Sequence, residues 1–222
     1  MKVKVQRLGV REGYDRWSAT YDETSNPLVA LDDQHSLALL DPRPGERILD
    51  AACGTGRHLA RLVQAETRPV GLDFARGMLR AARQRLPQAL LVQADLHHGL
   101  PLRRGSLDAA LFALVGEHLT GLDVVFLEAH AVLKRGGRLV FSVFHPELAA
   151  TGIEANFEQH GTEYRLGAER HSVEDYLDAV RGAGFRDVKW REYAGDSSLA
   201  RRIPKAAKYV GRKLLLIVSA RA

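Results

Sequence analysis

A run of small residues in the first third of the chain has the composition of a loop that can approach a ligand closely. The run is Asp50-Ala51-Ala52-Cys53-Gly54-Thr55-Gly56, and it follows an apolar stretch. Gly54 and Gly56 have no side chain, so the backbone there can pass close to a ligand and adopt a positive φ at little cost. If a helix begins at Arg57, its first amide groups form an electropositive end that suits a carboxylate or a phosphate. A glycine pair alone is a weak signal, since many loops between a strand and a helix contain one.

Two acidic residues at the ends of later apolar runs strengthen this signal. Asp73 ends the run 68–73, and Asp95 ends the run 89–95. A carboxylate after the second strand can accept hydrogen bonds from both hydroxyls of a ribose. A carboxylate after the third strand can accept one from the amino group of adenine. The loop and the two acids therefore predict a site for an adenosine-containing ligand, although NAD-binding proteins share the first acid.

Candidate proton-transfer groups follow the next two apolar runs. His118 comes after the fourth run and His145 after the fifth, and histidine titrates near neutral pH. Adjacent strands would bring the two together, so we predict His118 and His145 as catalytic residues. Glu117 and His171 are further candidates.

The sequence predicts no metal site. None of the nine histidines belongs to a pair with ligand spacing on a helix and a third ligand nearby, and His97 and His98 are expected in a surface loop. The single cysteine, Cys53, excludes a multi-cysteine metal site and an internal disulfide.

These residues need a scaffold that brings strand ends to one edge. Apolar runs of strand length alternate with helical patterns from about residue 47, which predicts a doubly wound α/β sheet with helices on both faces. The expected strands are 47–52, 68–73, 89–95, 107–114 and 138–144, and the expected helices are 57–65, 75–86 and 122–134. In the tail, a helix at 173–183 precedes strands at 187–193 and 213–220 with no long helix between them. This tail predicts an antiparallel edge hairpin.

One domain of four parts is predicted. Residues 1–40 form an N-terminal cap, 41–145 a cofactor-binding core, 146–171 a substrate cap, and 172–222 the C-terminal helix and edge hairpin. Both caps are expected at the carboxyl ends of the strands, where open α/β sheets bind ligands. In the substrate cap, Arg165 and Arg170 are equally compatible with binding an acidic substrate beside Tyr164 and with being surface charges.

The composition fits a globular protein of 222 residues, of which 45% are hydrophobic and 27% charged. No apolar run approaches the roughly 18 residues of a membrane span, and the N-terminus lacks a signal-peptide pattern, so we expect a cytoplasmic protein. The net charge is +5, but the arginines are scattered along the chain, which makes nucleic acid an unlikely partner. Basic residues concentrate between Arg201 and Lys213.

The ordered set of motifs resembles class I S-adenosylmethionine-dependent methyltransferases, in particular the small-molecule branch of the ubiquinone and biotin pathways. The resemblance is carried by residues 49–56, 70–78, 92–100, 106–119 and 128–144. It implies a Rossmann-like, seven-stranded mixed sheet with the last strand antiparallel, and S-adenosylmethionine as the cofactor. The family commonly has glycine where this chain has Ala52, so we expect a slightly shifted loop. The predicted cofactor residues are Tyr14, Tyr21, Asp50, Ala52, Gly54, Thr55, Gly56, Asp73, Phe74, Met78, Ala94, Asp95, Leu96 and Leu114.

Several acceptor classes are disfavoured. Residues 113–118 lack the Asn/Asp-Pro-Pro-aromatic motif of amino-methylating enzymes of this fold, and Cys53 is not expected to act as a nucleophile. We therefore predict in-line methyl transfer to a small molecule. The alternatives are an RNA or protein methyltransferase, an NAD-dependent oxidoreductase, and a non-catalytic methyltransferase-like binding protein. The acceptor atom, the need for a general base and the oligomeric state stay open.

Overall fold

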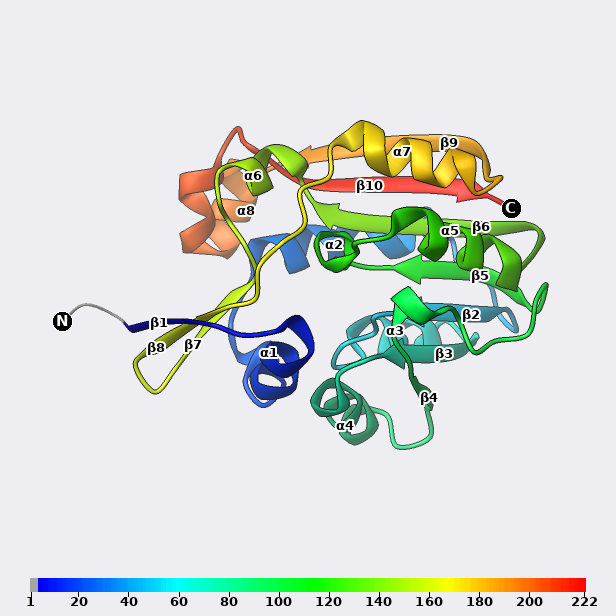
Figure 1. The fold of residues 1–222 in the computed structure, drawn as a ribbon, viewed down its shortest axis with the longest axis horizontal. Coiled ribbons are helices and arrows are strands. Elements are labelled where there is room, and N and C mark those ends of the chain that lie inside the picture. The colour runs from blue at the N-terminus through cyan, green and yellow to red at the C-terminus, as the bar shows by residue number, and fades with distance from the viewer. Residues whose placement is uncertain (1–3) are drawn as a thin grey trace.

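The computed structural model describes residues 4–222 and contains a seven-stranded sheet with helices on both faces (Figure 1). The strand order is β4-β3-β2-β5-β6-β10-β9. The strands are β2 (Arg47–Ala51), β3 (Arg68–Asp73), β4 (Leu90–Gln93), β5 (Leu107–Phe112), β6 (Leu133–Phe144), β9 (Arg186–Ala194) and β10 (Lys213–Arg221). The α/β fold expected from the alternating pattern is confirmed.

The two C-terminal strands, β9 and β10, form one end of the sheet. β10 pairs antiparallel with both β6 and β9, whereas the pairs from β4 to β6 are parallel. Most of β10 is apolar and buried, so it lies inside the sheet, while β9 is largely exposed and forms the edge. The predicted antiparallel hairpin is therefore confirmed.

Two apolar cores lie on opposite faces of the sheet, because successive strand residues point to opposite sides. On one face, Phe112 and Phe141 pack with α5 (Leu122–Val132) and α7 (Val173–Gly182). On the other face, strand residues pack with α2 (Pro27–Leu40), α3 (Arg57–Gln64) and α8 (Ser197–Arg202). The remaining core helix, α4 (Arg76–Arg85), contacts β3 and β4.

The predicted N-terminal cap of residues 1–40 includes a helix that belongs to the core. α2 packs on β6, β10 and β5, so residues 27–40 belong to the core. The segment that covers the strand ends consists of α1 (Val10–Trp17) and a 3₁₀ turn at Tyr21–Glu23.

A second, three-stranded sheet joins the two caps, and the sequence pattern did not predict it. β1 (Lys4–Arg7) pairs in parallel with β8 (Thr162–Arg165), which pairs antiparallel with β7 (Asn156–Gln159). Phe157, Tyr164 and Leu166 form its apolar core, with Tyr14 and Trp17 of α1 packed against them. Figure 1 shows this sheet beside α1, next to the open end of the main sheet.

The boundary between α5 and β6 differs from the prediction. The helix was expected to continue to residue 134 and the strand to start at 138, but α5 ends at Val132 and β6 begins at Leu133. Gly136 has a φ of 78° and lies inside β6. In residues 4–222, no helix combines the length and apolar character that crossing a membrane requires.

Candidate cofactor and acceptor site

The glycine-rich loop connects β2 to α3 through a series of positive φ angles. Ala52, Gly54 and Gly56 have φ values of 57°, 54° and 80°. The alanine adopts the left-handed conformation that glycine takes more readily. A Cβ placed on Gly54 would meet no atom within 4 Å, so this part of the loop presents open backbone.

Asp73 fixes this loop from the end of β3. Its Oδ2 accepts a hydrogen bond from the Gly54 amide at 2.9 Å, and its Oδ1 accepts one from the Ala75 amide at 2.8 Å. The residue is buried, and burial raises the pKa of its carboxyl to about 6. The carboxylate thus holds the loop against the neighbouring strand, and it also borders a cavity.

Asp95 precedes a 3₁₀ turn at Leu96–His98 and accepts hydrogen bonds from the His97 amide and the His97 ring nitrogen Nδ1. His97 Nε2 accepts from the Thr120 amide at 3.2 Å. This arrangement places the ring proton on Nδ1, so the imidazole holds the carboxylate in place. His97 was expected in a surface loop; its side chain is 30% exposed, and it also lines the same cavity as Asp95. His98, with an 82% exposed side chain, matches that expectation.

The cofactor cavity lies at the carboxyl ends of β2, β3, β4 and β5 and contains about 650 Å³ of empty space, partly open to solvent. Of the predicted cofactor residues, all except Asp50, Thr55 and Gly56 line it. The residues around it are Tyr14, Tyr21, Ala52, Gly54, Leu72, Asp73, Phe74, Met78, Ala94, Asp95, Leu96, His97, Ala113, Leu114, Val115, His118 and Leu119. Leu72 and Ala113 at strand ends, and Leu119 after the turn at residues 116–118, were not predicted; their closeness in sequence to predicted residues was the available signal.

The three predicted residues outside the lining have other surroundings. Thr55 Oγ1 donates to Asp22 Oδ1 at 3.0 Å and so ties the loop to the N-terminal segment. Gly56 caps α3, and a Cβ there would lie 3.2 Å from the Ala82 Cβ of α4. Asp50 is fully buried, and neither carboxyl oxygen has a hydrogen-bond partner within residues 4–222. Burial raises its pKa to about 6.

Aromatic residues of the N-terminal segment cover the cavity. Tyr14 Oη lies 2.9 Å from His118 Nε2, and the Tyr14 ring stacks on Trp17. Trp17 stacks in turn on Phe157 of the small sheet, at a centroid distance of 5.1 Å. The predicted position of Tyr14 over the site therefore depends on contacts with both caps.

Glu117 and His118 lie on a buried 3₁₀ turn, Gly116–His118, after β5. Burial lowers the pKa of His118 to about 4, so the imidazole is neutral at physiological pH. Burial raises the pKa of Glu117 to about 8. Glu117 Oε2 and His118 Nδ1 have no hydrogen-bond partner within the part of the chain that the structure describes.

His145 does not face His118, which corrects the predicted pairing. Its Nε2 lies 2.8 Å from Glu192 Oε1 of β9, and its Nδ1 accepts from the Glu147 amide at the start of α6 (Pro146–Ala150). β5 and β6 are adjacent, as expected, but the His145 side chain is directed towards the edge hairpin. His145 lines neither the cofactor cavity nor the cavity next to it.

That second cavity, the acceptor cavity, is larger and contains about 2430 Å³ of empty space, partly open to solvent. It shares Tyr14, Tyr21 and Leu114 with the cofactor cavity. Its wall includes Glu117 and many apolar side chains, among them Leu28, Phe144, Leu148, Ile153, Phe157, Ile203 and Leu214. A 3₁₀ helix at Pro204–Tyr209 contributes Lys205 and Lys208, members of the basic concentration seen in the sequence.

The side chains considered for an acidic substrate lie elsewhere. Tyr164 is buried in the small sheet, and Arg165 Nε donates to Glu163 Oε1 at 2.8 Å. Neither Arg165 nor Arg170 lines the acceptor cavity. The structure therefore favours the surface-charge interpretation of these arginines.

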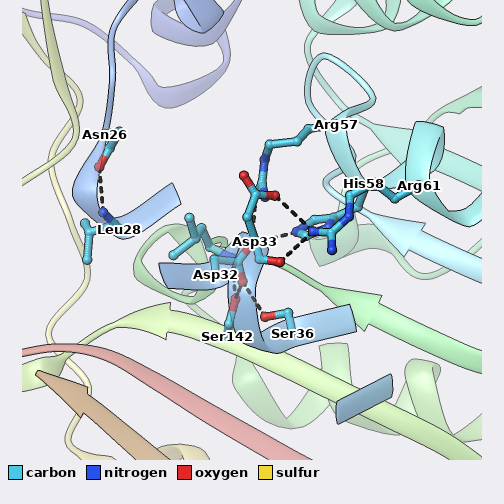
Figure 2. A network of polar contacts seen from close by, with 10 residues as sticks. Asn26, Leu28, Asp32, Asp33, Ser36, Arg57, His58, Arg61 and Ser142 are labelled. Atoms are coloured by element: carbon cyan, nitrogen blue, oxygen red, sulfur yellow. Dashed lines mark hydrogen bonds and ion pairs between the residues drawn. The ribbon is translucent and has the colours of Figure 1, made fainter. Parts of the chain in front are cut away.

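A polar network around the buried Asp32 joins α2, α3 and β6 (Figure 2). Asp32 Oδ2 accepts from Arg57 and lies 2.6 Å from His58 Nε2, while Asp32 Oδ1 accepts from the Ser36 and Ser142 hydroxyls. Burial by itself raises the pKa of Asp32, but the hydrogen bond from His58 and the charges of His58 and Arg57 outweigh it and hold the pKa well below its usual range. The Arg57 guanidinium pairs with both Asp32 and Asp33.

The network also positions Leu114. Ser142 accepts two hydrogen bonds from the Leu114 amide, one at its carbonyl (2.9 Å) and one at its hydroxyl (3.0 Å). Leu114 has a φ of 52°, a conformation that a bulky residue keeps only when its surroundings enforce it. This strained residue forms part of the wall shared by both cavities. Among residues 4–222, no group of three or more histidine, cysteine, aspartate or glutamate side chains could hold a metal ion.

Comparisons with known proteins agree with this geometry. A family model described as "Methyltransferase domain" matches residues 49–141. A malonyl-[acyl-carrier protein] O-methyltransferase of Laribacter hongkongensis is 37% identical over 197 residues, covering 79% of the present chain and 63% of that protein, so the chain spans less than two thirds of its length. A demethylmenaquinone methyltransferase of Clavibacter sepedonicus is 31% identical over 226 residues, covering 88% of this chain and 90% of that one.

A solved structure supports the fold independently. The crystal structure of an S-adenosylmethionine-dependent methyltransferase from Mesorhizobium loti superposes with a TM-score of 0.74 at 24% identity, covering 86% of this chain and 97% of that one. The chain belongs to the class I S-adenosylmethionine-dependent methyltransferases.

Proposed function

We propose that the protein transfers a methyl group from S-adenosylmethionine, bound in the cofactor cavity, to a small molecule bound in the acceptor cavity. The observation that carries this proposal is that the two cavities share Tyr14, Tyr21 and Leu114 as a common wall. Because these residues border both cavities, the cavities are neighbours, and a ligand in one can contact a ligand in the other where they meet.

The residues of the cofactor cavity fit an adenosine-containing cofactor. Carboxylates from Asp73 and Asp95 reach the cavity from two adjacent strands, and the loop at Gly54 leaves backbone open to a ligand. In the proposal, Asp73 binds the ribose hydroxyls and Asp95 the adenine amino group, with Phe74 and Met78 beside them. When bound, S-adenosylmethionine supplies an electrophilic methyl group on a sulfonium.

The protein's main contribution to the reaction is orientation. Holding two reactants in line converts a bimolecular step into an effectively unimolecular one. Tyr14 and Tyr21 line both cavities where they meet, and the network around Asp32 holds Leu114 in place. We propose that the neutral imidazole of His118 keeps the Tyr14 hydroxyl directed towards this junction.

Calorimetry with S-adenosylmethionine, S-adenosylhomocysteine and NAD tests the cofactor part of the proposal. We expect the first two to bind and NAD not to bind. Asp73→Ala is expected to weaken S-adenosylhomocysteine binding more than tenfold, because it removes both the proposed ribose contact and the hydrogen bond that holds Gly54. Asp178→Ala, a change of a 75% exposed carboxylate on α7, is the matched control and should bind normally. Binding of NAD alone would contradict the proposal.

The acceptor requires a separate screen. Demethylmenaquinone and malonyl-[acyl-carrier protein], named in the relatives, are its first candidates, alongside RNA and protein substrates. Methylation of a small molecule supports the proposal. Methylation of RNA or protein alone would replace the acceptor class, and cofactor binding without turnover would favour a non-catalytic role.

A further inference from the structure

Glu117 carries a buried carboxyl oxygen that has no hydrogen-bond partner in the described part of the chain. We infer that Glu117 receives a proton from the acceptor, and that the acceptor presents an O–H or N–H group at this end of the acceptor cavity. The inference rests on the proposed function, since it assigns a role within the same site.

The first observation is the position of the carboxyl group. The Glu117 side chain is 8% exposed, and the residue lines both the acceptor cavity and a smaller cleft beside the cofactor cavity. Its Oε2 is buried and has no hydrogen-bond partner within residues 4–222. A buried polar atom without a partner is energetically unfavourable, so it marks a position where a ligand that donates a hydrogen bond would be stabilised.

The second observation is that the backbone around Glu117 is fixed. Its carbonyl accepts a hydrogen bond from the Glu169 amide at 2.8 Å. A Cβ on the preceding Gly116 would lie 2.5 Å from Phe141 and 2.8 Å from Val143, so the turn is pressed against β6. The carboxyl group is therefore held at the cavity wall by backbone contacts.

The third observation concerns the titratable groups around the carboxyl. On its own turn, His118 Nε2 lies 4.0 Å from Glu117 Oε1. Tyr14 of α1, Tyr21 of the 3₁₀ turn and Tyr176 of α7 are close enough for a Glu117 charge to raise their pKa values. None of these groups carries a positive charge at neutral pH. Burial is the main influence on the carboxyl and raises its pKa to about 8, whereas His118, with a pKa of about 4, is the weaker base.

The rest of the wall indicates the body of the acceptor. Phe144, Leu148 and Ile153 are apolar side chains of the same cavity. Ligand pockets of this kind use apolar walls for affinity and a few polar groups for orientation. The wall also carries charged side chains such as Lys205 and Lys208, so the acceptor is expected to combine an apolar part with a hydroxyl or amine group that points towards Glu117.

The chemical step balances with no further reactant. An oxygen or nitrogen lone pair of the acceptor forms the bond to the methyl carbon, and the sulfur–methyl bond breaks with its electron pair on sulfur. The acceptor's O–H or N–H bond breaks, and its proton passes to the ionised Glu117 carboxylate. Only the ionised form can take the proton, so this role requires the fraction of Glu117 that is deprotonated.

The test uses two uncharged probes, one with a hydroxyl donor and one in which a methyl group replaces the donor hydrogen. Binding of 2-naphthol and of 2-methoxynaphthalene is measured by calorimetry in the presence of saturating S-adenosylhomocysteine. The wild-type protein is expected to bind 2-naphthol at least tenfold more tightly, and this ratio should increase between about pH 6.5 and about pH 8.5 as Glu117 ionises. Glu117→Leu should reduce the ratio to near one, and Glu117→Gln should remove its pH dependence.

Glu174→Gln is the control, because Glu174 is an exposed carboxylate on α7 that lines neither cavity. Thermal unfolding and S-adenosylhomocysteine binding of each variant separate a local effect from misfolding. A ratio near one in the wild type, no binding of 2-naphthol, or an unchanged ratio in Glu117→Leu would overturn the inference while leaving cofactor binding intact. Loss of S-adenosylhomocysteine binding by the wild type would instead count against the proposed function.

Discussion

Ala52 places an L-amino acid in the left-handed conformation within the cofactor loop, with a φ of 57°. This conformation costs a residue with a Cβ roughly 1–2 kcal/mol relative to glycine. The loop keeps the geometry because Asp73 holds Gly54 and because the Cys53 amide donates to the Leu72 carbonyl at 2.9 Å. These neighbouring hydrogen bonds therefore offset the backbone strain at Ala52.

Ala52→Gly is accordingly expected to stabilise the protein by about 1 kcal/mol, measured as the free energy of unfolding in urea. Ala60→Gly, in the middle of α3, is the matched control and should destabilise by about 1 kcal/mol, because there the helix favours alanine. Equal destabilisation by both changes would show that Ala52 is not strained.

For individual residues, the cavity carboxylates could be predicted from the sequence more readily than the side chains that hold them in place. Asp73 and Asp95 could be predicted from their places at strand ends. His97 could not, because its role depends on a ring contact with Asp95 and an amide of Thr120 that follows from the fold of two loops. The pairing of His118 with His145 failed for a related reason: strand adjacency fixes Cα positions, but side-chain direction depends on what each histidine contacts.

Among the elements, α2 and α3 are joined by the network around Asp32. Asp32→Asn is expected to destabilise by about 3 kcal/mol, because an amide nitrogen would face a hydroxyl or guanidinium donor within a fully buried site. Asp33→Asn is the control: Asp33 shares Arg57 but its side chain is 36% exposed, so a loss below about 1 kcal/mol is expected.

The Asp32 effect should also depend on pH. Its folded pKa lies well below the unfolded value of about 3.9, so its contribution is present above that pH and decreases as the pH falls towards the folded pKa. The difference in unfolding free energy between wild type and Asp32→Asn should therefore shrink below about pH 4. Urea titrations at several pH values measure it, and a difference that grows in acid would contradict the assignment.

The contact between α1 and α4 positions the aromatic cover. Asp15 Oδ1 accepts from the Gly77 amide, and a Cβ on Gly77 would lie 2.6 Å from the Asp15 carbonyl oxygen. Gly77→Ala is thus expected to displace α1 and weaken S-adenosylhomocysteine binding at least tenfold in calorimetry. Gly182→Ala, at the end of α7 where a Cβ meets no atom within 4 Å, should leave binding unchanged. Normal binding by Gly77→Ala would show that α1 does not need this contact.

For the molecule as a whole, the sequence predicted the main sheet and missed the small one. The main sheet could be predicted because its strands are apolar runs at regular spacing, and such runs become buried when they pair in a sheet. β1 and β8 are short and largely polar, and their pairing depends on two caps meeting in space. Likewise, residues 27–40 were assigned to a cap because the sequence does not show which helix packs on which face.

The parallel pairing of β1 with β8 has a consequence for how the chain folds. It joins Lys4 to Thr162, so a long stretch of chain must close before the small sheet can form. Closing such a loop has a large entropic cost that local contacts do not repay, which delays contacts of this kind during folding. We expect the main sheet to form first and the aromatic cover of the cofactor cavity to assemble last. In refolding experiments, the far-ultraviolet circular dichroism of the sheet should therefore recover before the protein regains its capacity to bind S-adenosylhomocysteine.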